Sequence, residues 1–255
     1  IKLSVYDLDE ALVKKFANRG ANEGKNPQNT MQACDVIITC LPSPSASNEV
    51  MQQMIDFVTP GKVWIEMSTT DEAEVRRLGA LVMDKGGAAV DCPVSGGCHR
   101  ADTGNISIFS GCDRSTFEYI LPLLTKMGRR VLHTGELGSA SILKVITNYL
   151  ATANLVSCAE ALTVAKGAGM DLSVAYKAFS ISSGNSFVNE TESQVILNGS
   201  RDISFTMDLV AKDIGLFQAV ADRAKIPLEL NPLLISIFAD GCLLYTSDAA
   251  DDRVS

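Results

Sequence analysis

The sequence is poor in histidine and has no paired cysteines, and both shortages limit the metal chemistry available to it. It contains two histidines, and none of its seven cysteines belongs to a C-x-x-C pair. Zinc sites are usually built from four such ligands, so the isolated neighbours Cys98 and His99 predict no metal site. An odd number of cysteines, with no signal peptide at the start of the printed sequence, is typical of reduced thiols. We therefore expect a cytoplasmic protein.

Basic residues are also in short supply. Lysine and arginine number 22 against 30 aspartates and glutamates, for a net charge of −8, whereas a nucleic-acid surface usually carries a basic stripe. Residues 145–165 are apolar and long enough to span a membrane, but Asn148, Asn154 and Glu160 would then lie in lipid. We expect neither a nucleic acid nor a membrane as partner, and we interpret the apolar stretch as a core or interface helix.

What the sequence does contain is an alternation of short apolar runs and helical segments, which is typical of an α/β fold with a parallel sheet. Its 255 residues, 46% of them hydrophobic, can bury a substantial core and hold two domains. The pattern becomes all-helical from Gly138 onward. Helix N-caps are predicted at Asp113 and at Thr69, the latter with Glu72 completing a capping box. The expected strands are residues 3–6, 36–40, 63–66, 88–90, 106–109 and 131–132, and the expected helices include residues 9–17, 72–83, 115–127 and 139–167.

A turn suited to an anion follows one of these strands. Pro93 fixes its own φ and favours an extended residue before it, so the chain leaves the strand at residues 88–90 and then turns. Ser95, Gly96 and Gly97 then offer a hydroxyl and backbone amides without bulky side chains, a composition that can bind carboxylate or phosphate. The same three residues also suit an ordinary strand-ending turn.

Lys144 lies near the start of a long helix that carries little charge. Between Lys144 and Lys166 the only formal charge is Glu160, and a helix that is apolar nearly all round is usually buried. A lysine there either extends to solvent from one end of the helix or is held in a cleft. Asn148 comes four residues later and therefore shares a face with Lys144. A cleft would make Lys144 a candidate proton-transfer group.

Three ordered motifs carry a resemblance to a known family. Residues 91–97 (DCPVSGG), with Ala101 and Gly104, are similar to the substrate-binding motif of the β-hydroxyacid dehydrogenases, which include 3-hydroxyisobutyrate dehydrogenase, tartronate semialdehyde reductase and, more distantly, 6-phosphogluconate dehydrogenase. Residues 135–148 resemble the catalytic motif of that family, and residues 211–215 (AKDIG) resemble a later motif for cofactor and substrate. The resemblance implies a Rossmann-type parallel sheet domain followed by an all-helical domain.

The resemblance also implies roles for residues at the substrate. Lys144 would be the general acid/base and would polarise the substrate oxygen, and Asn148 would orient the same group. Ser95, Gly96 and Gly97 would hold the substrate carboxylate. This is chemically coherent, because alcohol oxidation needs a base near the hydroxyl and desolvation can bring the pKa of a lysine toward the working pH.

The cofactor implied by the resemblance is NAD rather than NADP. A carboxylate at the end of the second strand binds the ribose hydroxyls and repels the extra phosphate of NADP. Residues 1–6 resemble that strand, which makes Asp7 the ribose-binding acid, although a turn or cap role is the alternative. The Gly-rich G-x-G-x-x-G loop that normally precedes this strand does not occur in the sequence. The expected cofactor-binding residues are Asp7, Leu41, Pro42, Thr69, Lys212 and Asp213.

Domain boundaries follow from these matches. We expect residues 1–137 to form an incomplete NAD-binding domain without its first strand and Gly-rich loop, and residues 138–241 to form a helical domain. Residues 242–255 have no amphipathic period and look foreign to the family, so we expect a non-native tail there.

The resulting functional hypothesis is NAD-dependent oxidation of a small β-hydroxyacid, similar to 3-hydroxyisobutyrate, to a semialdehyde or keto acid, by a homo-oligomer (dimer or tetramer). The alternative is an inactive scaffold or fragment that dimerises through its helical domain. Two departures from the family pattern, Ala140 and Arg100, put the identity of the substrate in question more than the reaction. Arg100 either meets a second acidic or hydroxylated group of the substrate or is an exposed loop arginine.

Overall fold

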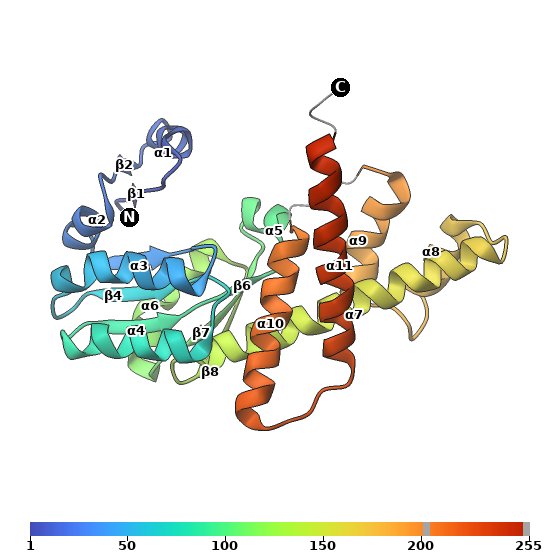
Figure 1. Ribbon diagram of the computed structural model, residues 1–255. Coiled ribbons are helices and arrows are strands. Elements are labelled where there is room, and N and C mark those ends of the chain that lie inside the picture. Colours follow the sequence, from blue (N-terminus) through green and yellow to red (C-terminus); the bar gives the residue numbers. More distant parts are fainter. Residues whose placement is uncertain (201–204, 252–255) are drawn as a thin grey trace. The chain divides into compact units, whose positions relative to one another are not determined.

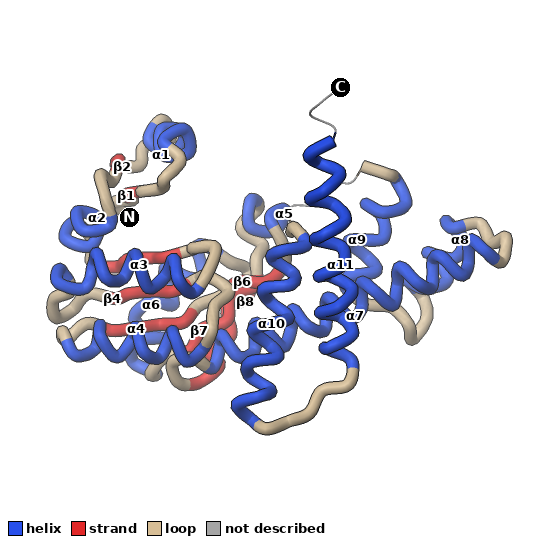
Figure 2. Tube along the Cα trace, viewed as in Figure 1, coloured by secondary structure: helices blue, strands red, loops and turns tan. Residues whose placement is uncertain are grey.

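The structure is a computed structural model, which describes the backbone of residues 1–200 and 205–251. The chain divides into two compact units, Ile1–Lys144 and Val145–Ser255. The first unit is built on a β-sheet with helices and the second is helical (Figures 1 and 2). The predicted α/β fold, with a Rossmann-type sheet followed by a helical domain, is confirmed.

The first unit contains a six-stranded sheet. Its order is β3 (Val36–Thr39), β4 (Val63–Glu66), β5 (Ala88–Asp91), β7 (Ser107–Gly111) and β6 (Val94–Ser95), and β8 (Arg130–Gly135) also pairs with β7. The pairs β3–β4, β4–β5 and β7–β8 are parallel, but β7 is antiparallel to β5 and β6. The predicted parallel sheet therefore has an exception at β7, which runs antiparallel to β5 and β6. A parallel return needs a long crossover, whereas the chain between β5 and β7 forms only β6 and the short helix α5 (Cys98–Asp102).

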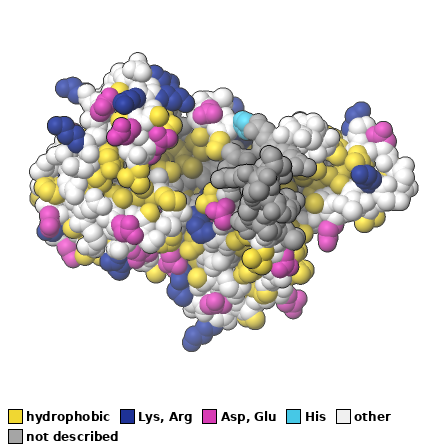
Figure 3. All heavy atoms as spheres, turned by 45° about the horizontal axis from the view of Figure 1, so that its top comes forward, with side chains coloured by type: hydrophobic (Ala, Val, Ile, Leu, Met, Phe, Trp, Pro, Cys, Tyr) yellow, Lys and Arg dark blue, Asp and Glu magenta, His cyan; other side chains and the backbone are white. Residues whose placement is uncertain are grey.

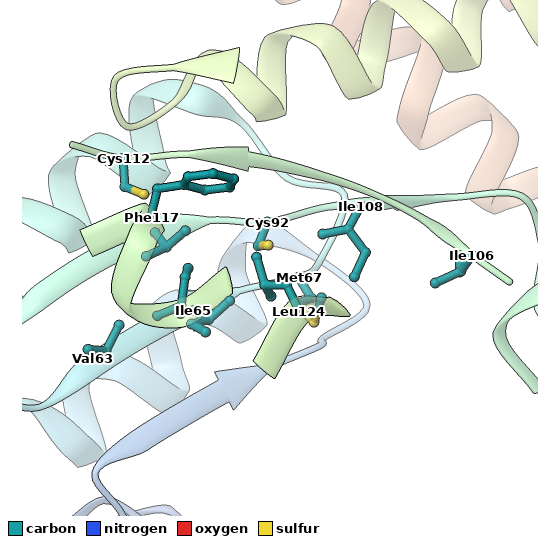
Figure 4. Packing of buried hydrophobic residues seen from close by; sticks show 11 residues of the cluster. Val63, Ile65, Met67, Cys92, Ile106, Ile108, Cys112, Phe117 and Leu124 are labelled. Atoms are coloured by element: carbon teal, nitrogen blue, oxygen red, sulfur yellow. The ribbon is translucent and has the colours of Figure 1, made fainter. Parts of the chain in front are cut away.

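Helices cover both faces of this sheet (Figure 1), and β4 shows why. All four of its residues, VWIE, are buried. Trp64 packs into a core with α3 (Pro44–Met54) and α4 (Glu72–Asp84), whereas Val63 and Ile65 point to the other face and pack with α6 (Arg114–Met127). This follows from the alternation of side chains along a strand. Figure 4 shows the second core, in which Ile65 of β4 and Cys92, the residue after β5, lie near Phe117 and Leu124 of α6.

The start of the chain forms a separate two-stranded parallel sheet. It consists of β1 (Ser4–Val5) and β2 (Asn22–Glu23), joined by α1 (Glu10–Ala17). The strand predicted at residues 3–6 is therefore present, although shorter. A helix, α2 (Pro27–Ala33), leads from β2 to β3, which is an end strand of the six-stranded sheet.

Helix starts agree with the sequence at one of two predicted positions. Asp113 is the N-cap of α6 and accepts a hydrogen bond from the amide of Thr116 at 3.0 Å. Thr69 is not the N-cap of α4. That position belongs to Asp71, whose carboxylate accepts from the amide of Ala73 at 2.8 Å, and aspartate is a stronger N-cap than threonine.

The second unit consists of helices. After α7 (Ser139–Gly167), which begins in the first unit, come α8 (Leu172–Ser180), α9 (Phe187–Asn198), α10 (Met207–Ala224) and α11 (Leu230–Asp251). Val210 and Ile214 of α10 pack with Leu234 and Phe238 of α11. The region predicted as a non-native tail is helical up to Asp251, and residues 252–255 lie outside the described residues.

Candidate active site

The turn of Ser95, Gly96 and Gly97, predicted to bind the substrate carboxylate, is called the cradle below. The segment that leads into it is hydrogen-bonded to two neighbouring strands. The amide of Cys92 donates to the carbonyl of Glu66 at 2.6 Å, and the carbonyl of Pro93 accepts from the amide of Phe109 at 3.0 Å. Gly96 and Gly97 then adopt φ values of 127° and 79°, a region that residues with a Cβ rarely occupy. The turn therefore needs glycine at both positions, and its amides carry no side chains.

Arg100 lies against this turn. A Cβ added at Gly96 would stand 2.8 Å from Cδ of Arg100, so the aliphatic part of the arginine covers the glycine. Arg100 belongs to α5 and is exposed. The aliphatic part of the Arg100 side chain therefore packs on the turn that contains Gly96.

Lys144 is largely buried, with 9% of its surface exposed. Ser141 and Val145 on the same helix are 2% and 1% exposed, so the side of α7 that carries Lys144 is enclosed. Lysine is rarely buried to this degree without a specific environment. Of the two positions open to it from the sequence, the enclosed one is observed.

Asp91 connects β5, the strand that leads to the cradle, with α7, the helix that carries Lys144. From the sequence it was recognised only as part of a motif. It is fully buried, and its carboxylate oxygens accept from the amides of Gly138 at 2.8 Å and Ser141 at 2.7 Å. Burial raises the pKa of Asp91, while the two amide donors act in the opposite direction. The available signal in the sequence was an aspartate that ends a buried strand.

The loops after β3 and β4 carry three expected cofactor-binding residues. Leu41 and Pro42 follow β3 and Thr69 follows β4. The amide of Leu41 donates to Oγ of Ser68 at 2.7 Å, and the Ser68 hydroxyl and amide both donate to the carboxyl group of Glu66. The structure thus ties the two loops together at the carboxyl edge of the sheet.

Glu66 is a second carboxyl group that sequence reasoning missed. It is 1% exposed, and burial raises its pKa. Hydrogen bonds from Ser68 act against this rise. Its hydrogen-bond partner, Ser68, lies only two residues away. The sequence does not show, however, whether a glutamate at the end of a strand is buried or exposed.

Asp7 lies in the loop after β1 and is exposed. Its Oδ1 accepts a hydrogen bond from the amide of Asp9 at 2.9 Å, and Asp9 in turn is the N-cap of α1. Asp7 therefore shapes the turn before α1, as the alternative interpretation held, and its exposed carboxylate still stands at the carboxyl end of the strand.

In the second unit, three expected residues come together between α7 and α10. Nδ2 of Asn148 donates to Oδ2 of Asp213 at 2.5 Å, and Nζ of Lys212 lies 3.2 Å from Oδ1 of the same carboxylate. The Asp213 side chain is 2% exposed and that of Lys212 is 24% exposed. A buried carboxylate thus fixes the amide of Asn148 and the ammonium of Lys212.

Family models match nearly the whole chain. Residues 1–135 match the NAD binding domain of 6-phosphogluconate dehydrogenase, and residues 138–252 match the model described as NAD-binding of NADP-dependent 3-hydroxyisobutyrate dehydrogenase. The chain belongs to the β-hydroxyacid dehydrogenase family. Like its 3-hydroxyisobutyrate dehydrogenase-type relatives, it is an NAD(P)-dependent hydroxyacid dehydrogenase.

Relatives within this family share about a third of the residues. The chain is 30% identical over 245 residues to 2-(hydroxymethyl)glutarate dehydrogenase of Eubacterium barkeri, covering 94% of this chain and 81% of the relative. It is 30% identical over 249 residues to NAD-dependent L-serine dehydrogenase of Pseudomonas aeruginosa, covering 92% and 83%. For mitochondrial 3-hydroxyisobutyrate dehydrogenase of Rattus norvegicus the identity is 30% over 250 residues, covering 94% and 75%.

Solved structures show the same fold. The crystal structure of 3-hydroxyisobutyrate dehydrogenase from Salmonella typhimurium aligns with a TM-score of 0.85 at 22% identity, covering 94% of this chain and 86% of that one. A complex of Mycobacterium tuberculosis 3-hydroxyisobutyrate dehydrogenase with L-serine aligns with a TM-score of 0.85 at 23% identity, covering 93% and 84%.

Proposed function

We propose that this protein uses NAD to oxidise a small β-hydroxyacid of the form HOCH2–CH(R)–COO⁻ to its semialdehyde, with Lys144 as the general acid/base. The observation that carries the proposal is the enclosed position of Lys144 in a helix that Asp91 ties to the strand leading into the carboxylate cradle. The three relatives named for 2-(hydroxymethyl)glutarate, L-serine and 3-hydroxyisobutyrate support the substrate class, because those compounds share this core and differ in R.

The proton and the carboxylate are handled by separate groups. The amides of Gly96 and Gly97 and the hydroxyl of Ser95 hold the carboxylate, which orients the substrate. Lys144 takes the hydroxyl proton as the carbon that bears the hydroxyl gives up its hydride to NAD, and the alcohol becomes an aldehyde. Asn148, fixed by Asp213, orients the reacting oxygen.

The residues of the first unit fit a dinucleotide. NAD supplies the hydride acceptor. In open α/β sheets such ligands bind outside the carboxyl ends of the strands, which is where Leu41, Pro42 and Thr69 lie on loops tied through Ser68. The exposed carboxylate of Asp7 would accept from the ribose hydroxyls, and Lys212 and Asp213 would act at the nicotinamide end.

Asp7 also supports NAD over NADP, because its charge repels a ribose phosphate. Asp7→Ser should lower kcat/KM with NAD and raise it with NADP, whereas Glu10→Ser on the adjacent helix should change neither. The measurement is kcat/KM for both cofactors. An NADP preference in the unaltered protein would contradict the assignment of Asp7.

R is the part of the substrate that Arg100 could distinguish. A carboxylate in R, as in 2-(hydroxymethyl)glutarate, could pair with the guanidinium of Arg100, whose aliphatic carbons lie against Gly96. Arg100→Ala should then lower kcat/KM for that diacid far more than for 3-hydroxyisobutyrate or L-serine. Equal activity across the three compounds, unchanged in Arg100→Ala, would reject a substrate role for this arginine.

The decisive test is NAD reduction with those three hydroxyacids. Because the sequence contains no G-x-G-x-x-G loop, the assay is run on the chain as printed and on the chain fused behind a strand, Gly-rich loop and helix. Lys144→Ala should abolish the activity, and Lys166→Ala, an exposed lysine at the other end of α7, should preserve it. Activity retained by Lys144→Ala would overturn the proposal. Cofactor binding without turnover of any compound would favour the inactive scaffold instead.

A further inference from the structure

Two elements of the first unit meet at a buried carboxylate that no catalytic step uses. Asp91 is the last residue of β5, and Gly138 and Ser141 lie at the start of α7. The carboxylate spans both amides, at 2.8 Å and 2.7 Å, from a fully buried position. The first amides of a helix have no partner within the helix, and a negative group there is stabilised by the helix dipole.

Short segments connect this contact between Asp91 and the start of α7 (the joint) to the cradle on one side and to Lys144 on the other. Toward the cradle, Ser95 comes four residues after Asp91, and the intervening segment is held by the hydrogen bonds of Cys92 to Glu66 and of Phe109 to Pro93. In the other direction, Lys144 comes three residues after Ser141 on the same helix, within one turn. A shift of the helix start therefore moves Lys144 relative to the cradle.

The packing around the joint leaves it no room to slide. A Cβ at Gly111 of β7 would collide with Oδ1 of Asp91 and come within 2.9 Å of both the Glu136 carbonyl and Oγ of Ser139. The hydroxyl of Ser139 is itself hydrogen-bonded to that of Thr134 at 2.7 Å. The start of α7 thus lies closely against Gly111 of β7, next to the Asp91 carboxylate.

We propose that Asp91 is a positioning residue for the reaction: its carboxylate holds the first turn of α7 and thereby sets the position of Lys144 relative to the Ser95, Gly96 and Gly97 turn. This inference rests on the proposed role of Lys144. It assigns to the aspartate of the cradle motif a task that is separate from contact with the substrate.

The test is Asp91→Asn, which keeps the shape of the side chain but turns an amide donor toward one of the two backbone donors. Hydrogen exchange of the peptide that contains Gly138 and Ser141 should become faster. The kcat for hydroxyacid oxidation should fall roughly tenfold to a hundredfold, as expected for a small displacement of a reacting group, while the dissociation constant for NAD stays unchanged.

Asp113→Asn is the matched control, because Asp113 caps α6 from an exposed position in the same unit. It should leave both the kcat and the exchange at residues 138–141 unchanged. Unchanged exchange in Asp91→Asn, or a kcat equal to that of the control, would overturn the inference. If Asp91→Asn does not fold, the unaltered chain decides: slow exchange of the Gly138 and Ser141 amides supports the inference and fast exchange rejects it.

Failure of the proposed function gives a different result. If Lys144→Ala keeps its activity while Asp91→Asn speeds exchange at the helix start, Lys144 is not the proton-transfer group, and the hold of Asp91 on α7 is still demonstrated. If Lys144→Ala is inactive and Asp91→Asn behaves like Asp113→Asn, the catalytic assignment stands and the positioning role is rejected.

Discussion

At the scale of single residues, one substitution of Lys144 distinguishes a role in proton transfer from a purely electrostatic role. Lys144→Arg should fail nearly as badly as Lys144→Ala, because a guanidinium keeps the positive charge but does not give up its proton in the working range. Loss of general acid/base catalysis typically lowers the rate by about a hundredfold to ten-thousandfold. Steady-state kcat at saturating substrate is the measurement. If Lys144→Arg keeps most of the turnover, Lys144 acts electrostatically and Lys212 becomes the next candidate for proton transfer.

Residues differ in how far the sequence could reveal them. The enclosed position of Lys144 could be predicted from the sequence as one of two alternatives, because the helix around it carries so little charge. The two glycines of the cradle could be predicted because turns of this kind require glycine. The role of Asp91 could not, since its partners lie 47 and 50 residues away and only the folded chain brings them together. Asp213 was expected near the cofactor, but its hydrogen bond to Asn148 likewise depends on the packing of two distant helices.

At the scale of elements, Lys62 closes the end of α2. Its ammonium donates to the carbonyls of Met31 at 2.7 Å, Gln32 at 3.2 Å and Cys34 at 2.7 Å. These carbonyls lie at the helix C-terminus, where a positive charge is also favoured by the dipole. Lys62→Met should lower the free energy of unfolding by roughly 1.5–3 kcal/mol, the range for hydrogen bonds to charged groups.

The control for that prediction is Lys85→Met. Lys85 also lies in the first unit, but it is exposed and pairs with the exposed Asp56 at 3.5 Å. Exposed ion pairs contribute about 0–1 kcal/mol, so urea denaturation should show a much smaller loss for this variant. Equal losses for the two variants would mean that the three carbonyl contacts of Lys62 add nothing.

The cap of α6 should make stability depend on pH in a defined window. Hydrogen bonds from the side chains of Ser115 and Thr116, and from the Thr116 amide, lower the pKa of Asp113 to about 2. Because the folded pKa lies below the unfolded one, the stabilisation is complete above the usual aspartate range and is lost as the pH falls toward 2. Asp113→Ala should therefore cost about 1 kcal/mol at neutral pH and progressively less below pH 4. A cost that is constant between pH 6 and pH 3 would contradict this linkage.

Elements with local signals were predicted well, and those that depend on pairing were not. The continuous apolar run of β4 predicted its bounds, because this strand is buried on both faces. β8 was expected at residues 131–132 and extends over Arg130–Gly135, since pairing with β7 recruits His133 and Thr134, which carry no apolar signal. The antiparallel direction of β7 was not predicted for the same reason, because the direction of a strand depends on the connection before it and on the strand it pairs with.

At the scale of the whole molecule, the distribution of charged side chains bears on whether the surface suits a nucleic acid. On the face shown in Figure 3, basic side chains are interspersed with acidic ones and with hydrophobic ones. This pattern differs from the basic stripe expected of a nucleic-acid surface.

The helix α7 is long and apolar, and most of its apolar stretch is not buried. By length and composition it could cross a membrane, with a mean hydropathy of 1.2 in its most apolar window, but only 17% of that window is buried. The core helices of water-soluble proteins pass the same composition test, so this alone is weak evidence for a membrane. Of the two interpretations offered by the sequence, core or interface, the low burial favours an interface.

The last prediction is that this helix dimerises the protein. Leu150, Ser157 and Val164 follow one another at seven-residue steps and so share a face, on which Leu150 and Val164 are 53% and 70% exposed. Introducing two carboxylates there, with Leu150→Glu and Val164→Glu together, should convert a dimer into a monomer because both charges would be desolvated at the interface. Met83→Glu, on α4 of the first unit and 50% exposed, is the control and should leave the dimer intact. Sedimentation velocity over a range of concentrations measures both, and a monomeric unaltered chain, or a double variant that sediments as the unaltered chain does, would show that α7 is not the interface.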